Sequence, residues 1–142
     1  MTEADPQIHD REKRRDALAA LGVDPYGGRY EGVRSAAEVR AEADAASIPP
    51  GEKSVLRARV AGRIALYRLM GKLGFLTIRD RTGTIQIGLN RADLESAWPV
   101  LKELQQGDFI GVEGVVGRTR TGELTVWTET LTVLCKALRP PP

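Results

Sequence analysis

The sequence predicts a mainly β fold with helices, in which two amino-terminal helices precede a barrel of five strands. Two observations lead to this prediction. The apolar residues up to about residue 47 follow a helical period, whereas those after Gly51 alternate with a period of two, as in strands with one buried face. The alternating part divides into five segments, with one helix-like segment between the third and the fourth.

The first two predicted elements are helices. Asp5-Pro6 suits the start of a helix that runs to about residue 21. Ser35, followed three residues later by Glu38, has the pattern of a capping box and predicts a second helix that ends near Ser47. We therefore expect residues 1–52 to form an amino-terminal helical extension.

Five strands are predicted in residues 53–138. The first contains alternating apolar or small residues from Leu56 to Leu66, which form its buried face, and Gly62 allows the strand to bend. The others are expected at 73–80, 84–90, 107–118 and 123–134, with a helix at 93–104. This order is that of an OB-fold, a five-stranded Greek-key barrel. A small sandwich is the structural alternative, and residues 139–142 are a proline-rich end or linker.

The composition is that of an ordinary globular domain. Its 142 residues are 42% hydrophobic and 28% charged, and no run of about 18 apolar residues predicts a membrane span. The charged amino end lacks the apolar stretch of a secretory signal, and Cys135 is the single cysteine. We therefore expect a cytoplasmic location, with Cys135 as a small buried residue.

The positive charge is concentrated in one part of the chain. The formal net charge is only +2, but residues 53–81 contain eight basic residues and one acid, which gives +7 there and −5 elsewhere. The basic residues are Lys53, Arg57, Arg59, Arg63, Arg68, Lys72, Arg79 and Arg81. Clustered charge of this kind indicates a polyanion partner. The alternative is a solvated face whose acidic counter-charges come from elsewhere in the fold.

An aromatic ring and an amide are predicted side by side on the outer face of the barrel. Alternation in the second and third strands places Phe75 and Gln86 outside if the apolar residues fill the core. A ring there can stack on a base and an amide can read a base edge, while Arg68 and Lys72 hold phosphates. The alternatives are packing of Phe75 under a loop or an amino-terminal helix, a solvated Gln86, and Arg68 and Lys72 as two solvated loop cations.

The turn between the last two strands is a further candidate. Arg118 and Arg120 are placed to contact phosphates and Glu123 to accept a hydrogen bond from a base, although ordinary turn chemistry explains the same residues. Trp98 and Trp127 are interpreted as packing residues. No catalytic site is predicted, because the chain has one histidine, no glycine-rich phosphate loop and no metal-ligand spacing.

Four stretches of the sequence carry a family pattern. They are VAGRIALYRLMGKLGFLTIRDRTGTIQI, GDFIGVEGVVGRTRTGELTV, LTVLCKALRPPP and, near the start, REKRRDALAALGVDPYG. These stretches resemble the amino-terminal anticodon-binding domain of class II lysyl-tRNA synthetases, over nearly the whole chain. RxxGKxxF, TGELT and KALRP are together specific, because the related aspartyl and asparaginyl enzymes usually lack the last two.

The resemblance implies a partner and a site. The partner would be tRNA carrying the lysine anticodon, whose middle base is uridine. Phe75 would stack on an anticodon base, while Arg68, Gln86 and Glu123 would make the polar contacts that read the uridines. The first helix would lie near the tRNA backbone through Arg14 and Arg15. The basic residues Lys72, Arg63 and Arg79 complete the candidate nucleic-acid-binding set. The amino-terminal helices suggest a homodimer as a further arrangement.

The chain also departs from that family. The class II catalytic domain, with its ATP and Mg²⁺ sites, does not follow the proline-rich motif, in which Pro141 replaces the usual leucine. We therefore expect no aminoacylation and no cofactor for these residues. The chain is either a fragment of a lysine–tRNA ligase or a freestanding paralogue. The alternative functions are a non-specific single-stranded nucleic-acid binder and a protein-interaction or dimerisation module.

Overall fold

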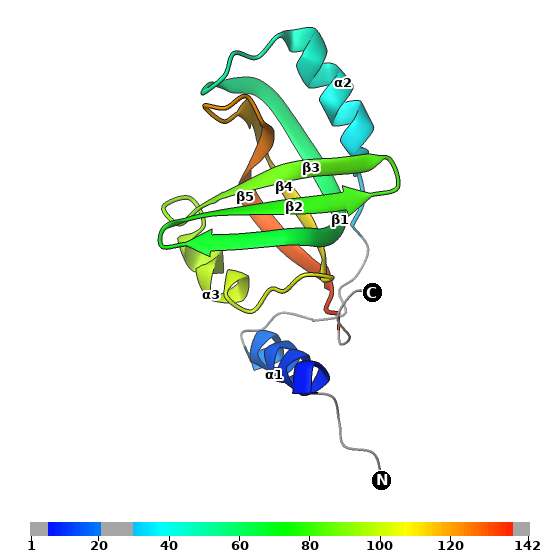
Figure 1. Cartoon of the computed structure of the whole chain (residues 1–142), viewed down its shortest axis with the longest axis vertical. Helices are drawn as coiled ribbons and strands as arrows, with labels where there is room; N and C mark the ends of the chain where they lie inside the picture. Colours follow the sequence, from blue (N-terminus) through cyan, green and yellow to red (C-terminus); the bar gives the residue numbers. More distant parts are fainter. Residues whose placement is uncertain (1–5, 21–29, 138–142) are drawn as a thin grey trace.

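A computed structural model describes residues 6–20 and 30–137 of the chain. Two helices lead into five strands, and a short helical segment separates the third strand from the fourth (Figure 1). The elements are α1 (Pro6–Ala20), α2 (Ala36–Ala46), β1 (Lys53–Met70), β2 (Leu73–Asp80), β3 (Gly83–Asn90), η1 (Glu95–Ala97), α3 (Trp98–Leu101), β4 (Phe109–Arg118) and β5 (Leu124–Cys135). This order confirms the prediction from the sequence.

The five strands close into a barrel in the order β1-β2-β3-β5-β4. All neighbouring strands are antiparallel except β3 and β5, which run parallel. The predicted OB-fold barrel is therefore confirmed. The parallel pair is short and joins Gln86 to Thr125 and Gly88 to Trp127, so it brings the start of β5 beside the middle of β3.

β1 is the longest strand, with 18 residues, and it pairs with two others. It runs beside β4 as far as Arg63 and beside β2 from Arg63 onward, curving around the barrel as Figure 1 shows. Gly62 lies at this exchange of partners, where an added Cβ atom would stand 2.7 Å from the carbonyl oxygen of Arg79. Only glycine permits the backbones of β1 and β2 to come so close.

The barrel interior is filled by aliphatic side chains from every strand. Ile64, Ile78, Ile87, Val112 and Val126 are all buried, as the period of two along each strand requires. α3 covers one end of this core with Trp98 and Leu101. It is anchored by Tyr67 of β1, whose hydroxyl donates to the carbonyl oxygen of Leu101 and whose pKa burial raises to about 12.

α2 begins at the capping residue predicted from the sequence. The hydroxyl of Ser35 accepts a hydrogen bond from the backbone N–H of Glu38 at 3.1 Å. The start of α2 is also fixed to the barrel, because the Asp80 carboxylate accepts from the backbone N–H of Ala36 at 2.7 Å. Burial alone would raise the pKa of Asp80, but the hydrogen bonds from Thr82, Ala36 and Gly83 outweigh it and hold this pKa below its usual value.

α1 packs against the α3 end of the barrel through buried Arg11 and Leu18. The Arg11 guanidinium donates to the carbonyl oxygen of Gln106 at 2.9 Å. Beside it, Lys136 and Asp108 form a fully buried ion pair with a distance of 2.7 Å between Nζ and Oδ2. The end of β5 and the start of β4 are thereby joined beneath α1.

Two expectations need correction here, and others lie outside the described residues. The helix expected at 93–104 is much shorter, because the carbonyl and side-chain oxygens of Asn90 accept backbone N–H groups from the next turn and η1 precedes α3. Cys135 is exposed rather than buried, because a register shift between β4 and β5 beside it breaks the alternation. α1 begins at Pro6 as expected, whereas the capping role expected for Asp5, the turn that the sequence indicates at residues 24–28 and the proline-rich end at 139–142 fall outside the described residues.

Candidate nucleic-acid interface

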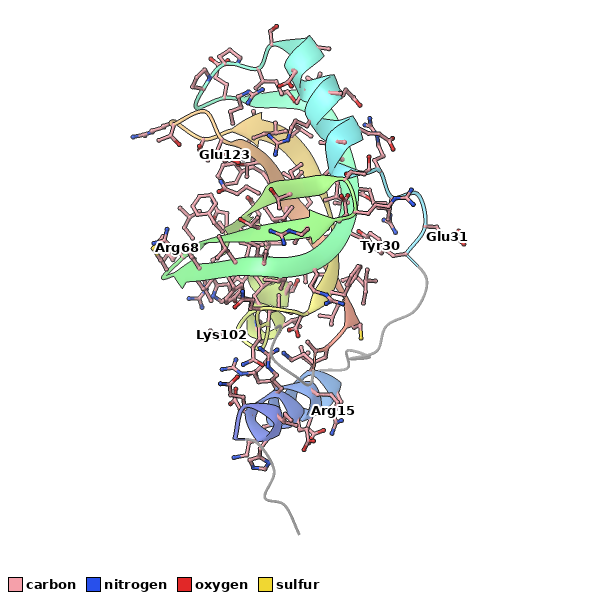
Figure 2. All side chains as sticks on the ribbon, turned by 45° about the vertical axis from the view of Figure 1, so that its right-hand side comes forward. Arg15, Tyr30, Glu31, Arg68, Lys102 and Glu123 are labelled. Carbon is pink, nitrogen blue, oxygen red and sulfur yellow. The ribbon has the colours of Figure 1, made fainter. Side chains whose placement is uncertain are left out.

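A groove of about 350 Å³ lies on the outer face of the barrel, between the β1–β2–β3 sheet and the connection from β4 to β5. Its walls are formed by Leu66, Arg68, Phe75, Thr77, Gln86, Thr119, Thr121 and Glu123. Figure 2 shows Arg68 and Glu123 on the same side of the molecule, on different elements. The groove therefore brings together four residues singled out from the sequence: Arg68, Phe75, Gln86 and Glu123.

Strand register explains why these side chains share one face. Arg68 of β1 is the cross-strand partner of Phe75, and Thr77 of β2 is the partner of Gln86. Between them, residues such as Leu76 point into the core and are fully buried. Because side chains alternate between the faces of a sheet, the neighbours of each core residue project into the groove.

Phe75 is half-buried because its ring packs against Trp127 of β5. The two ring centroids lie 5.9 Å apart with an interplanar angle of 67°, an edge-to-face arrangement. Gly88 makes room for this contact, since a Cβ atom there would lie 2.4 Å from the indole ring. Lys53 lies over the indole, with Nζ 5.3 Å from its centroid. Phe75 is thus held in place by Trp127 rather than by an amino-terminal helix, and its ring also lines the groove.

The Gln86 amide is oriented by a short hydrogen-bond chain. Its Nε2 donates to the Thr125 hydroxyl at 3.1 Å, and that hydroxyl donates in turn to the carbonyl oxygen of Glu123 at 3.1 Å. No residue within 6–20 or 30–137 donates to the Oε1 atom of Gln86. The amide therefore presents a hydrogen-bond acceptor to the groove.

The wall formed by the β4–β5 connection is well structured. The backbone N–H of Thr119 donates to the carbonyl oxygen of Glu123 at 3.0 Å, and the backbone N–H of Glu123 donates to the Thr119 hydroxyl at 3.1 Å. Gly122 adopts a φ of +89°, which favours glycine at this turn. The Glu123 and Arg68 side chains are exposed and have no ion-pair partner within the described residues.

The remaining candidate residues lie outside this groove. Lys72 occupies the β1–β2 turn beyond Gly71 and is exposed. Arg63 and Arg79 face each other across β1 and β2 and line a second hollow.

Arg14 and Arg15 lie on α1, and Figure 2 shows Arg15 well away from the labelled groove residues. Arg14 pairs with Asp10 at 3.1 Å, and its hydrogen bond holds the pKa of Asp10 below the usual value.

Ion pairing divides the basic stretch into two groups. Arg57 pairs with Glu129, whose pKa this hydrogen bond lowers, and Arg59 pairs with Glu113 at 2.9 Å. For these arginines the counter-charge interpretation is correct. Arg118, a phosphate candidate from the sequence, is also occupied by hydrogen bonds and an ion pair at 3.1 Å. The side chains without a partner in the described part of the chain include Arg63, Arg68, Lys72, Arg79 and Arg81.

Several groove residues could not be identified from the sequence pattern. Leu66 was expected on the buried face of β1, but it is 61% exposed because a register shift between Ile64 and Leu66 turns it outward. Thr119 and Thr121 belong to a loop whose position depends on barrel closure. Trp127 was expected to be a packing residue, but its partner, Phe75, follows only from the parallel pairing of β3 with β5.

Residues 6–20 and 30–137 contain neither a helix that could span a membrane nor a cluster of side chains that could bind a metal ion. No helix there has the length and apolarity needed to cross a membrane. No group of three or more His, Cys, Asp or Glu residues there is arranged to hold a metal ion.

Comparisons with known proteins agree with this geometry. Residues 58–134 match the tRNA anticodon family, described as an OB-fold nucleic acid binding domain. The chain is 45% identical over 139 residues to a lysine–tRNA ligase of Streptococcus suis, a match that covers 97% of this chain and 28% of the relative. Lysine–tRNA ligases of Leuconostoc mesenteroides and Prochlorococcus marinus are 38% and 39% identical, and they cover 97% and 93% of this chain.

The matched part is thus little more than a quarter of each of these relatives, since the chain spans 28% of their length. The family match includes every strand that lines the groove. The chain therefore belongs to the tRNA anticodon family of OB-fold nucleic acid binding domains, and it is an anticodon-binding OB-fold domain like that of lysine–tRNA ligase.

Proposed function

We propose that this domain binds the anticodon loop of lysine tRNA and that the groove reads the middle uridine. One observation carries the proposal: Arg68, Phe75, Gln86 and Glu123 all line a single groove. The lysine–tRNA ligase relatives support lysine tRNA as the partner. The proposal assigns RNA recognition to these residues and leaves aminoacylation to the catalytic domain of a parent class II lysine–tRNA ligase.

In this proposal Phe75 supplies the stacking surface. Its edge-to-face contact with Trp127 fixes the ring before RNA arrives. A ring that is already ordered loses little conformational freedom on binding, so more of the stacking energy appears as affinity. Stacking of a base on an aromatic side chain contributes roughly 1–3 kcal/mol and depends little on base identity. Phe75 therefore provides affinity, and the polar residues around it provide selectivity.

Gln86 and Arg68 distinguish uridine from cytidine through hydrogen-bond polarity. Uridine presents an N3–H donor between two carbonyl acceptors, whereas cytidine has an N3 acceptor and an amino group on C4. The free Oε1 of Gln86 matches the uridine N3–H and would face the lone pair of cytidine N3. The Arg68 guanidinium is a donor for a uridine carbonyl oxygen, and Glu123 is an acceptor for a neighbouring base.

The test is a titration of the whole chain with two fluorescently labelled anticodon stem-loops at about 0.15 M salt. One carries the lysine anticodon, and the other differs only in having cytidine in place of the middle uridine. We expect the uridine loop to bind about tenfold more tightly, which corresponds to about 1.4 kcal/mol. Failure to bind either loop would contradict the proposal and leave a protein-interaction or dimerisation role.

A second function is favoured by the basic side chains that lack acidic partners, namely non-specific binding of single-stranded nucleic acid. Such a protein binds both loops equally, with affinity that falls steeply as salt increases. The same titration, repeated over a salt series, separates the two functions. Self-association remains a separate prediction, which sedimentation over a range of protein concentrations tests, and the cytoplasmic location also remains a prediction.

A further inference from the structure

A second hollow, of about 500 Å³, opens on the same outer face as the groove, toward the β2–β3 turn. Arg63, Arg79 and Arg81 line it together with Phe109, whose ring is 37% exposed. Nothing in the proposed reading of the anticodon uses this hollow. Three guanidinium groups beside a partly exposed aromatic ring form a site suited to a nucleotide, with its phosphate on the arginines and its base or ribose against the ring.

The positive charge of this hollow is not neutralised within the described residues. None of the three arginine side chains forms an ion pair or hydrogen bond there, in contrast to Arg57 and Arg59 earlier in the same strand. Asp80 is the one acid in the lining, and its carboxylate oxygens already accept hydrogen bonds from the start of α2 and from the β2–β3 turn.

The arginines are also arranged at an energetic cost. Arg63 and Arg79 are direct cross-strand partners in β1 and β2. Like charges placed opposite each other on neighbouring strands destabilise a sheet. An anion bound between them would remove this repulsion, so the pair is better suited to a ligand than to the stability of the barrel.

The hollow continues the path of the groove. Thr77 lines the groove and Arg79, two residues along β2, lines the hollow on the same face. At about 3.3 Å per strand residue, Arg79 lies about 13 Å from Phe75. OB-folds engage roughly 4–16 nucleotides of a single strand, more than a small groove can hold. A single strand of RNA bound at Phe75 therefore has to extend over the neighbouring surface. The arginine-lined hollow is part of that surface, because it lies next to the groove along β2.

We propose that Arg63, Arg79 and Arg81 form a second subsite, which holds the phosphate of a nucleotide flanking the base stacked on Phe75. This inference rests on the proposed function, because it requires RNA in the groove. It assigns the hollow to the RNA backbone, so it contributes affinity and salt dependence without base preference.

The test uses the whole chain with Arg79→Gln, Arg81→Gln and the double variant, titrated with both stem-loops between about 0.05 and 0.3 M salt. Each lost phosphate contact lowers the slope of log K against log salt by about 0.7, which makes binding about fivefold weaker at 0.1 M salt. The double variant is then about 25-fold weaker, while the ratio of affinities for the uridine and cytidine loops stays unchanged.

Arg57→Gln is the matched control. Arg57 lies in β1, is also exposed, and loses the same charge, but its guanidinium is already paired with Glu129. We expect its salt slope to equal that of the unmodified chain. If the salt slopes of Arg79→Gln and Arg81→Gln equal that of this control, the second subsite is wrong. The hollow would then be suited to another partner, such as an acidic protein surface.

A Phe75→Ala variant separates this failure from failure of the proposed function. If Phe75→Ala weakens binding and the uridine preference persists while the arginine variants have no effect, only the second subsite is wrong. If the arginine variants weaken binding but Phe75→Ala does not, the RNA lies on this face without entering the groove, and both the anticodon-reading proposal and the inference that rests on it are wrong.

Discussion

Replacing Phe75 with alanine removes the proposed stacking surface and leaves the rest of the groove in place. The expected loss of affinity for the lysine anticodon loop is about 1–3 kcal/mol, or roughly 5- to 150-fold in the dissociation constant. The structure indicates a modest effect on folding, because Phe75 is only half-buried and its main ring contact is Trp127. An edge-to-face pair of this kind contributes about 0.5–1.5 kcal/mol beyond area burial.

Two further substitutions at the same position separate stacking from packing. Phe75→Leu keeps much of the apolar volume against Trp127 but has no aromatic face, so we expect near-normal stability with the full loss of affinity. Phe75→Tyr keeps the ring, so we expect this variant to retain both its stability and its affinity for the RNA. The assay is fluorescence anisotropy with the uridine stem-loop, alongside urea unfolding of each variant. If the folded Leu variant binds as tightly as the unmodified chain, Phe75 is not the stacking residue.

Three other changes test the structure that supports the groove. Lys136→Met should lower the free energy of unfolding by about 3–5 kcal/mol, because it leaves the Asp108 carboxylate buried without its cation; a loss below about 1 kcal/mol in urea unfolding would contradict this. Gly88→Ala should displace the Trp127 ring, which a Cβ atom would approach to 2.4 Å, and should weaken RNA binding together with stability; normal binding would show that the ring position is unimportant. The pKa of Asp80 is lowered in the folded state, so its stabilising effect is present above an unfolded pKa of about 3.9 and is lost as pH falls through the folded value. Asp80→Asn should therefore be less stable than the unmodified chain at pH 7, by about 1 kcal/mol, with the difference shrinking below pH 4; a pH-independent difference in thermal unfolding would refute this.

Period-two alternation was sufficient to predict the face on which the groove lies. Phe75 and Gln86 alternate with buried aliphatic residues in two strands joined by a tight turn, so their shared face follows from local sequence. Arg68 and Glu123 were candidates for contacts to RNA from their positions in the sequence, and the family resemblance added their role in reading the uridines. The structure adds that they line the same groove, a fact that depends on how distant elements meet.

Local irregularities in the strands were not predictable from alternation. The register shift after Ile64 turns Leu66 to the surface, and a second shift near the end of β5 exposes Cys135. A bulge adds one residue to one strand and reverses the facing of everything beyond it. The sequence of a strand does not show where such a reversal occurs, so Leu66 and Cys135 were both assigned to the buried face although they are exposed.

Contacts between distant parts of the chain could not be predicted from the sequence pattern either. The parallel pairing of β3 with β5 places Trp127 beside Phe75, and Gly88 gives it room. The pairing of Arg57 with Glu129 joins residues 72 positions apart. Charge counting alone treated all the basic residues of β1 and β2 alike, and only the fold shows which of them have an acidic partner and which do not.

The most direct test of the central claim, that RNA binds in this groove, is an NMR titration of the ¹⁵N-labelled chain with the lysine anticodon stem-loop. We expect the largest changes in chemical shift at the Gln86 side-chain amide, the Trp127 indole N–H and the backbone amides of residues 119–123. Residues on α2 should change little. Shifts concentrated on α2, or on the face where Arg57 meets Glu129, with the Gln86 and Trp127 signals unmoved, would contradict the claim.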